Sequence, residues 1–183
     1  MSKGHHRPCP AEHAGWLVNP LRRLFQSPGR LLKPYVKAGM TAVDLGCGPG
    51  FFTIPMAKMV GEAGKVIAVD VQQAMLDQLK ARISGREIEG RIQLHLAEEQ
   101  TIGLRESADF VLAFYMVHEV PDQASFFQDV RSIVKPQGVL LVVEPPFGVS
   151  KKEFQEMLEK AAAAGFRASK GPGVFLSQSI VLS

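Results

Sequence analysis

Residues 43–53 constrain the fold of this chain more than any other segment. They read Val-Asp-Leu-Gly-Cys-Gly-Pro-Gly-Phe-Phe-Thr, with glycines at alternate positions. Residues 40–43 end in an apolar, β-branched segment typical of a buried strand, and residues 51–60 carry apolar side chains at helical spacing. Because a helix start offers unpaired N–H groups and glycine admits a ligand close to the backbone, this strand–turn–helix predicts a ligand site.

The spacing of the glycines separates two kinds of ligand. The dinucleotide fingerprint is G-x-G-x-x-G, in which the helix dipole faces a pyrophosphate. This chain instead has Gly46-x-Gly48-x-Gly50, with Asp44 two residues before the turn. A carboxylate at that place suits a cationic ligand better than a pyrophosphate, although a glycine-rich connection without a ligand stays an alternative.

The pattern Asp-x-Gly-x-Gly-x-Gly resembles the first motif of class I S-adenosylmethionine-dependent methyltransferases. The cofactor of that family carries an ammonium group and a sulfonium, and no phosphate. The resemblance implies that the backbone of Gly46, Gly48 and Gly50 approaches the cofactor. It also implies that Asp44 lies at the ammonium end and that Cys47, whose side chain is small enough for the bend, belongs to the same cofactor-binding turn.

A second acid, Asp70, ends an apolar segment at residues 66–70 that reads as the next strand. This strand starts about 20 residues after the glycine turn, where nucleotide-binding α/β folds place an acid that accepts hydrogen bonds from ribose hydroxyls. The two oxygens of a carboxylate match two vicinal hydroxyls, and a cap of the strand end is the structural alternative. We predict that Asp70 binds the ribose and that Val71 packs on the adenine face.

The segment after the third predicted strand, residues 91–96, is acidic. Enzymes of the family often have Gly-Asp-Ala at this point, with the acid accepting from the adenine amino group. Ala97 and Glu98 occupy that place, and Glu98 is one methylene longer than the usual acid. The resemblance assigns both residues to cofactor binding; Glu99 could substitute for Glu98, and a solvated acidic loop is the structural alternative.

The fourth predicted strand, residues 109–114, is almost wholly apolar, and Tyr-Met-Val-His-Glu-Val-Pro-Asp follows it. This passage resembles the fourth motif of the family, nearest the branch of quinone-biosynthesis methyltransferases. We expect Phe114 to line the cofactor pocket and Tyr115 to hydrogen-bond the methyl acceptor. His118 has a pKa suited to a general base, and Glu119 could orient it or neutralise a cationic substrate; structural roles for His118 and Glu119 stay open.

The remaining pattern completes the fold that the resemblance implies for residues 40–183. This is an α/β, Rossmann-like, doubly wound sheet of seven mostly parallel strands, with an antiparallel last strand and helices on both faces. The expected elements are helices at 73–83 and 123–134, a turn at 135–138, a strand at 139–143, a helix from a capping box at Ser150 and Glu153 to about residue 164, and strands at 166–170 and 174–182.

Residues 1–39 form a basic arm. They carry seven Lys and Arg residues and one acid, so their net charge is +6 and that of the remaining chain is −3. Apolar residues within 14–26 recur at the spacing of a short amphipathic helix. The resemblance implies an N-terminal helical extension that covers the active site, and a helix pair packed on the sheet edge is the alternative.

Composition narrows the class of protein. No run of 18 apolar residues occurs and the first residues are polar, so we expect a cytoplasmic protein without a transmembrane helix. Two cysteines, Cys9 and Cys47, supply neither a disulfide framework nor enough ligands for a metal, so no metal site is predicted.

The resemblance implies in-line methyl transfer from S-adenosylmethionine to a small-molecule acceptor, with S-adenosylhomocysteine as the product. Three alternatives stay open: a non-catalytic S-adenosylmethionine-binding or partner-docking module, an NAD(P)-binding oxidoreductase, and a nucleic-acid methyltransferase. The last is not expected, because no Asn-Pro-Pro-Tyr-type motif follows the fourth strand. A homodimer is compatible with the sequence, which does not identify the acceptor.

Overall fold

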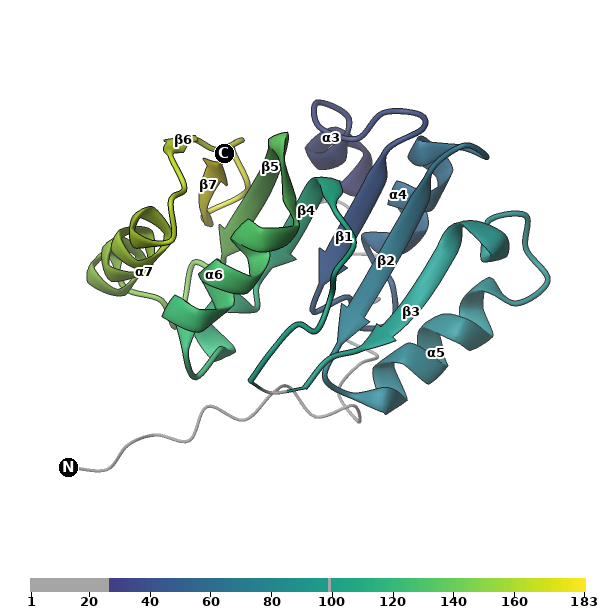
Figure 1. The fold of residues 1–183 in the computed structure, drawn as a ribbon, viewed down its shortest axis with the longest axis horizontal. Helices are drawn as coiled ribbons and strands as arrows, with labels where there is room; N and C mark the ends of the chain where they lie inside the picture. The colour runs from purple at the N-terminus through teal and green to yellow at the C-terminus, as the bar shows by residue number, and fades with distance from the viewer. Residues whose placement is uncertain (1–26, 99) are drawn as a thin grey trace.

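The computed structural model describes residues 27–98 and 100–183, so the predicted helix at 14–26 and Glu99 lie outside the described residues. The described residues form a central seven-stranded sheet in the order β3-β2-β1-β4-β5-β7-β6 (Figure 1). In chain order the elements are α3 (Pro28–Leu32), β1 (Thr41–Leu45), α4 (Thr53–Val60), β2 (Lys65–Asp70), α5 (Gln73–Ile83), η2 (Glu89–Arg91), β3 (Ile92–Leu96), β4 (Ala108–Phe114), η3 (Val117–Glu119), α6 (Gln123–Ile133), β5 (Val134–Glu144), α7 (Lys151–Ala163), β6 (Ala168–Lys170) and β7 (Gln178–Leu182).

The strand directions confirm the predicted fold class. β1 pairs in parallel with β2 on one side and with β4 on the other, and β3 and β5 extend the parallel sheet outward. β7 pairs antiparallel with β5, which gives the predicted antiparallel last strand, and β6 pairs antiparallel with β7 at the edge of the sheet. The strand order reverses between β1 and β4, and ligands of doubly wound sheets bind at such a switch point.

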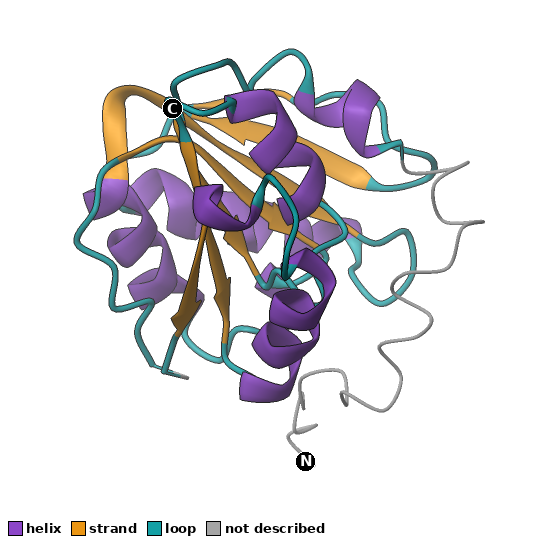
Figure 2. Cartoon of the chain, turned by 90° about the vertical axis from the view of Figure 1, so that its right-hand side faces the viewer, coloured by secondary structure: helices purple, strands orange, loops and turns teal. Residues whose placement is uncertain are grey.

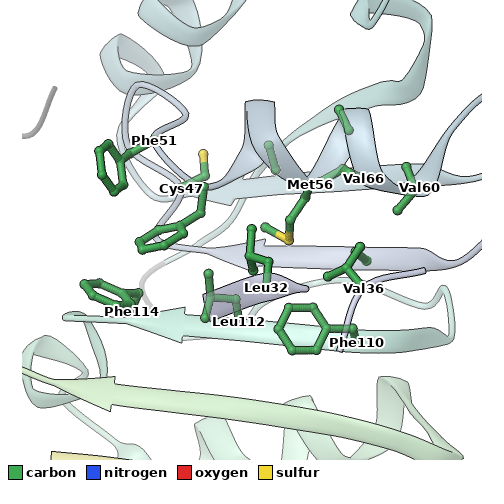
Figure 3. Close-up of a cluster of buried hydrophobic side chains, with 14 of the residues drawn as sticks. Leu32, Val36, Cys47, Phe51, Met56, Val60, Val66, Phe110, Leu112 and Phe114 are labelled. Carbon is green, nitrogen blue, oxygen red and sulfur yellow. The ribbon is translucent and has the colours of Figure 1, made fainter. Parts of the chain in front are cut away.

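Helices cover both faces of the sheet (Figure 2), because each central strand is apolar on both sides. In β4, Phe110 and Leu112 point into a cluster with α3, α4 and α5, part of which Figure 3 shows. Val111 and Ala113 point into the opposite cluster, with α6 and α7. This alternation buries residues 110–114 on both sides and fixes the register of the strand, since a slip by one residue would exchange the two faces.

The segment before β1 is part of the core. Leu32 is fully buried on α3, and the ring of Tyr35 stacks on Phe110 with 5.7 Å between ring centroids. Pro28 begins α3, a position that suits proline because an N–H there would have no partner within the helix. The division of the chain at residue 39 stays a prediction.

β5 differs from its prediction. It begins at Val134 and includes residues 135–138, for which we predicted a turn. Pairing with β4 passes from Ala108↔Val134 to Phe110↔Val139, so these four residues bulge from the ladder without ending the strand. Lys135 Nζ donates to Asp109 Oδ1 at 2.7 Å, which ties the bulge to β4. Proline and glycine therefore mark a bulge rather than a chain reversal.

Phe127 on α6 provides a test of the second core cluster. It is fully buried and meets the ring of Phe166 edge-on, with centroids 6.3 Å apart. Phe127→Ala should lower the free energy of unfolding by about 3–5 kcal/mol in urea denaturation, because it leaves a cavity that the sheet cannot fill. Phe147→Ala is the matched control, since Phe147 is 82% exposed. Equal effects of the two substitutions would contradict this packing.

Candidate active site

The parallel register brings most of the predicted site residues to one edge of the sheet. Leu45 at the end of β1 pairs with Val69 of β2 and with Ala113 of β4. The residue after Leu45 is Gly46, the residue after Val69 is Asp70, and the residue after Ala113 is Phe114. These three predicted site residues therefore lie side by side. Asp70 pairs in turn with Leu96 of β3, and Ala97 N–H donates to the Asp70 carbonyl at 3.0 Å.

The glycine turn is closely packed from two sides. Gly46 has φ +68° and Gly50 has φ +87°, backbone conformations that L side chains rarely adopt. A Cβ atom on Gly46 would lie 3.1 Å from the side chain of Met116, and one on Gly50 would clash with Leu79 of α5. These glycines therefore let the turn pass between α5 and the segment after β4.

Asp70 ties the glycine turn to the end of β2. Its Oδ2 accepts the N–H of Gly48 at 2.9 Å, and its Oδ1 accepts the N–H of Gln72 at 2.9 Å. Burial raises the pKa of the Asp70 carboxyl above its usual range, although the amides of Gln72, Gly48 and Val71 pull it down. The carboxylate is thus held in one place by backbone groups, and 8% of the residue is accessible to solvent.

Asp44 and Cys47 lie deeper than the sequence indicated. Asp44 is 2% exposed and accepts a hydrogen bond from Thr53 Oγ1 at 2.6 Å. Sequence reasoning missed Thr53, and its only signal was its place at the start of the helix after the glycines. The Cys47 side chain is buried in the first core cluster (Figure 3), and burial raises the pKa of its thiol. Its contribution to the turn is therefore through the backbone.

Two predicted adenine contacts lie at the surface. Val71 directly follows β2 and is 43% exposed, although its side chain is apolar. Glu98, after β3, is exposed and forms an isolated bridge with Thr101. Both side chains are therefore accessible to a ligand that lies across the ends of β2 and β3.

The end of β4 carries an aromatic stack. Phe114 lies with its ring centroid 4.5 Å from that of Phe52 and 4.2 Å from that of Tyr115. Tyr115 has φ +60°, which is rare for a residue with a bulky side chain. Its N–H donates to the Val143 carbonyl at 2.8 Å, and its hydroxyl lies 2.6 Å from Ser177 Oγ. The tyrosine thus links β4 and β5 to the loop before β7.

His118 on η3 contacts an acid that sequence reasoning did not assign to the site. Its Nδ1 lies 2.6 Å from Oε2 of Glu144, and its backbone N–H donates to Oε1 at 3.2 Å. Glu119 Oε1 is 3.9 Å from Nε2, too far for a hydrogen bond. The hydrogen bond with Glu144 raises the pKa of His118 above its usual range, against the effect of burial. The signal for Glu144 was an acid directly after five consecutive apolar strand residues.

Two classes of structure are absent from the described ranges. None of their helices is long and apolar enough to cross a membrane. They also contain no group of three or more His, Cys, Asp and Glu side chains that could hold a metal ion.

Comparison with known proteins identifies the family. The model of a family described as a methyltransferase domain matches residues 36–178. A demethylmenaquinone methyltransferase from Lactobacillus johnsonii is 36% identical over 110 residues, which cover 60% of this chain and 45% of that protein. One from Oceanobacillus iheyensis is 28% identical over 72% of this chain and 51% of its own length. The chain thus spans about half the length of the curated relatives it matches.

Solved structures agree with this result. A SAM-dependent methyltransferase from Aquifex aeolicus has a TM-score of 0.83 and 26% identity, with 96% of this chain and 98% of that one covered. The [4+2]-cyclase SpnF shares the fold alone, with a TM-score of 0.66, 18% identity and coverage of 81% of this chain and 58% of that one. The chain belongs to the class I S-adenosylmethionine-dependent methyltransferases, as its glycine motif predicted.

Proposed function

We propose that this chain transfers a methyl group from S-adenosylmethionine to a small-molecule acceptor with an ionisable hydroxyl group. The observation that carries the proposal is the hydrogen bond between Gly48 N–H and Asp70. It joins the family's glycine turn, which follows β1 at the switch point of the sheet, to a fixed carboxylate at the end of the neighbouring strand β2; doubly wound folds bind ligands at such a switch point.

The residues at this edge suit the cofactor. A carboxylate offers about four lone-pair directions, more than the backbone amides around Asp70 occupy, so it retains acceptors for ribose hydroxyls. The negative charge of Asp44 lies beneath the turn and favours an ammonium group there. Val71 and Glu98 are accessible for the adenine ring and its amino group. When bound, S-adenosylmethionine supplies a methyl group on a sulfonium sulfur, already activated for displacement.

His118 is the proposed general base. A phenol or enol becomes a better nucleophile when it loses its proton, and an imidazole with a pKa above its usual range is a stronger base once deprotonated. The name demethylmenaquinone methyltransferase of the curated relatives supports an acceptor with a hydroxylated aromatic ring. The methyl carbon joins the acceptor in line as its bond to sulfur breaks, and the proton leaves to His118. Tyr115 and Glu119 belong to the same segment after β4 as His118, and Tyr115 is proposed to contact the acceptor.

A screen separates this function from a binding module without catalysis. Hydroxylated aromatic acceptors, including naphthohydroquinone, are incubated with the chain and S-adenosylmethionine, and release of S-adenosylhomocysteine is measured. Acceptor-dependent release supports the proposal. Cofactor binding without release from any acceptor would instead favour a binding module, and release that depends on RNA or DNA and falls with salt would favour a nucleic-acid substrate.

Asp70→Asn tests the cofactor site. Replacing the charged acceptor should weaken S-adenosylmethionine binding by about 10- to 100-fold in isothermal calorimetry, since a hydrogen bond to a charged group is worth about 1.5–3 kcal/mol. Asp77→Asn is the control, because Asp77 is exposed on α5. A wild-type dissociation constant for the Asp70 variant would contradict the ribose role.

His118→Ala tests the base. The substitution should lower kcat by about 10²- to 10⁴-fold while the dissociation constant of S-adenosylmethionine stays near that of the wild type. In the wild type, kcat should rise with pH as His118 loses its proton, and because Glu144 raises the pKa of His118, this rise should lie above the usual range of histidine. Loss of turnover and cofactor binding to the same extent, or of neither, would reject the base.

A further inference from the structure

We propose that Glu144 is a positioning residue, which holds the imidazole of His118 in the orientation and tautomer that leave Nε2 as the proton acceptor. The inference deepens the proposed function and rests on it, because it concerns the base of that reaction. Nothing in the motifs assigned Glu144 to the site.

Two hydrogen bonds join Glu144 to one residue. Oε2 lies 2.6 Å from Nδ1 of the ring, and Oε1 accepts the backbone N–H of His118 at 3.2 Å. Glu144 is fully buried, whereas the His118 side chain is 25% exposed. The carboxylate therefore fixes both the backbone and the ring from inside the protein, while part of the His118 side chain stays accessible to solvent.

Strand register builds this contact. Val143 of β5 pairs with Phe114, the last residue of β4, so Glu144 follows at the level where the chain leaves β4. Tyr115 N–H donates to the Val143 carbonyl at 2.8 Å, which continues the link past the strand end. η3 then lies over the face of the sheet that carries α6 and α7. Its first residue, Val117, is fully buried in the core cluster on that face. His118 consequently lies over Glu144.

The chemistry of the pair sets the tautomer. An ionised carboxylate only accepts hydrogen bonds, so Nδ1 of His118 must carry the proton between them. A neutral imidazole with a proton on Nδ1 has its lone pair on Nε2. Nε2 is thus the nitrogen available as a base.

The proton step follows from that tautomer. The O–H bond of the acceptor breaks, its electron pair stays on oxygen, and the proton binds the Nε2 lone pair. The resulting imidazolium carries a positive charge beside the Glu144 carboxylate, which stabilises it without taking the proton. This requires no group beyond the acceptor and the two side chains.

Among the described residues, the charged groups that face the ring all favour the imidazolium. They are Glu144 on β5, Glu119 on η3 and Glu153 on α7, and burial of the ring is the opposing effect. Glu144 is the largest contributor, because it also hydrogen-bonds the ring. Removal of its charge should therefore lower the pKa of His118 more than removal of any more distant acid.

The first test observes the His118 ring in the full chain without ligand. Long-range proton–nitrogen NMR spectra, assigned with His118→Asn, identify the ring nitrogen that carries the proton in the neutral form. We expect the proton on Nδ1. A proton on Nε2 overturns the proposal, and this result needs no substitution at Glu144.

The second test removes the charge at nearly constant size. In Glu144→Gln the pKa of His118, followed by NMR titration, should fall. Glu156→Gln is the matched control on α7, because the Glu156 side chain is 50% exposed and pairs with Lys152. An unchanged His118 pKa in Glu144→Gln overturns the proposal. If Glu144→Gln does not fold, Glu144→Asp, which keeps the charge but withdraws it by one methylene, takes its place and should also lower the pKa.

The third test separates positioning from a structural role. With naphthohydroquinone as acceptor, Glu144→Gln should lower kcat at least about tenfold and move the rise of kcat to lower pH. Its dissociation constant for S-adenosylmethionine should equal that of the wild type, and it should cause no further loss of kcat in His118→Ala. A parallel fall of kcat and cofactor affinity, without a shift of the pH profile, overturns positioning.

The outcomes distinguish this inference from the function on which it rests. If the wild type binds S-adenosylmethionine but methylates no acceptor, the proposed function fails, and the tautomer and pKa still decide whether Glu144 positions the ring. If the wild type methylates naphthohydroquinone and Glu144→Gln keeps its kcat and pH profile, positioning fails and the function stands.

Discussion

The parallel register of β1 with its two neighbours is the constraint on which the candidate site depends. Leu45 pairs with Val69 on one side and with Ala113 on the other, so three strands end at the same level. The glycine turn, Asp70 and the segment after β4 therefore meet although they are distant in the chain. Apolar packing on both faces of the sheet holds the register, because a slip of one residue would place each strand's side chains on the wrong face.

Buried polar side chains gather at the same edge. Within the described ranges these are Asp44, Thr53, Asp70 and Glu144. Each has a hydrogen-bond partner: Thr53 for Asp44, backbone amides for Asp70, and His118 for Glu144. Burying a charge is costly even when it is paired, so acids are rare in a core unless chemistry requires them. Their shared location indicates that the otherwise apolar interior is polar at the edge of the sheet where the candidate active site lies.

Sequence periodicity predicted the elements with local signals well. The helix Gln73–Ile83 has its predicted bounds, and Ser150 and Glu153 form the predicted capping box. The glycine motif led to the family that the comparisons identify. Residues 135–138 were misread as a turn, because proline and glycine mark a bulge as well as a reversal, and only pairing with β4 distinguishes the two. Glu144 was missed because its partner, His118, is 26 residues away in sequence.

The sequence by itself determined the order of strands and helices, the ligand turn and the acid at the end of β2. These follow from spacing within a few residues, where side-chain periodicity and glycine conformation act. Only the tertiary structure decided which groups share the site at atomic range: Thr53 beneath Asp44, Gly48 on Asp70, and Glu144 on His118. Such partners depend on the register of neighbouring strands and on the face of the sheet toward which each side chain points. The register and the facing partners are set only when the sheet is assembled.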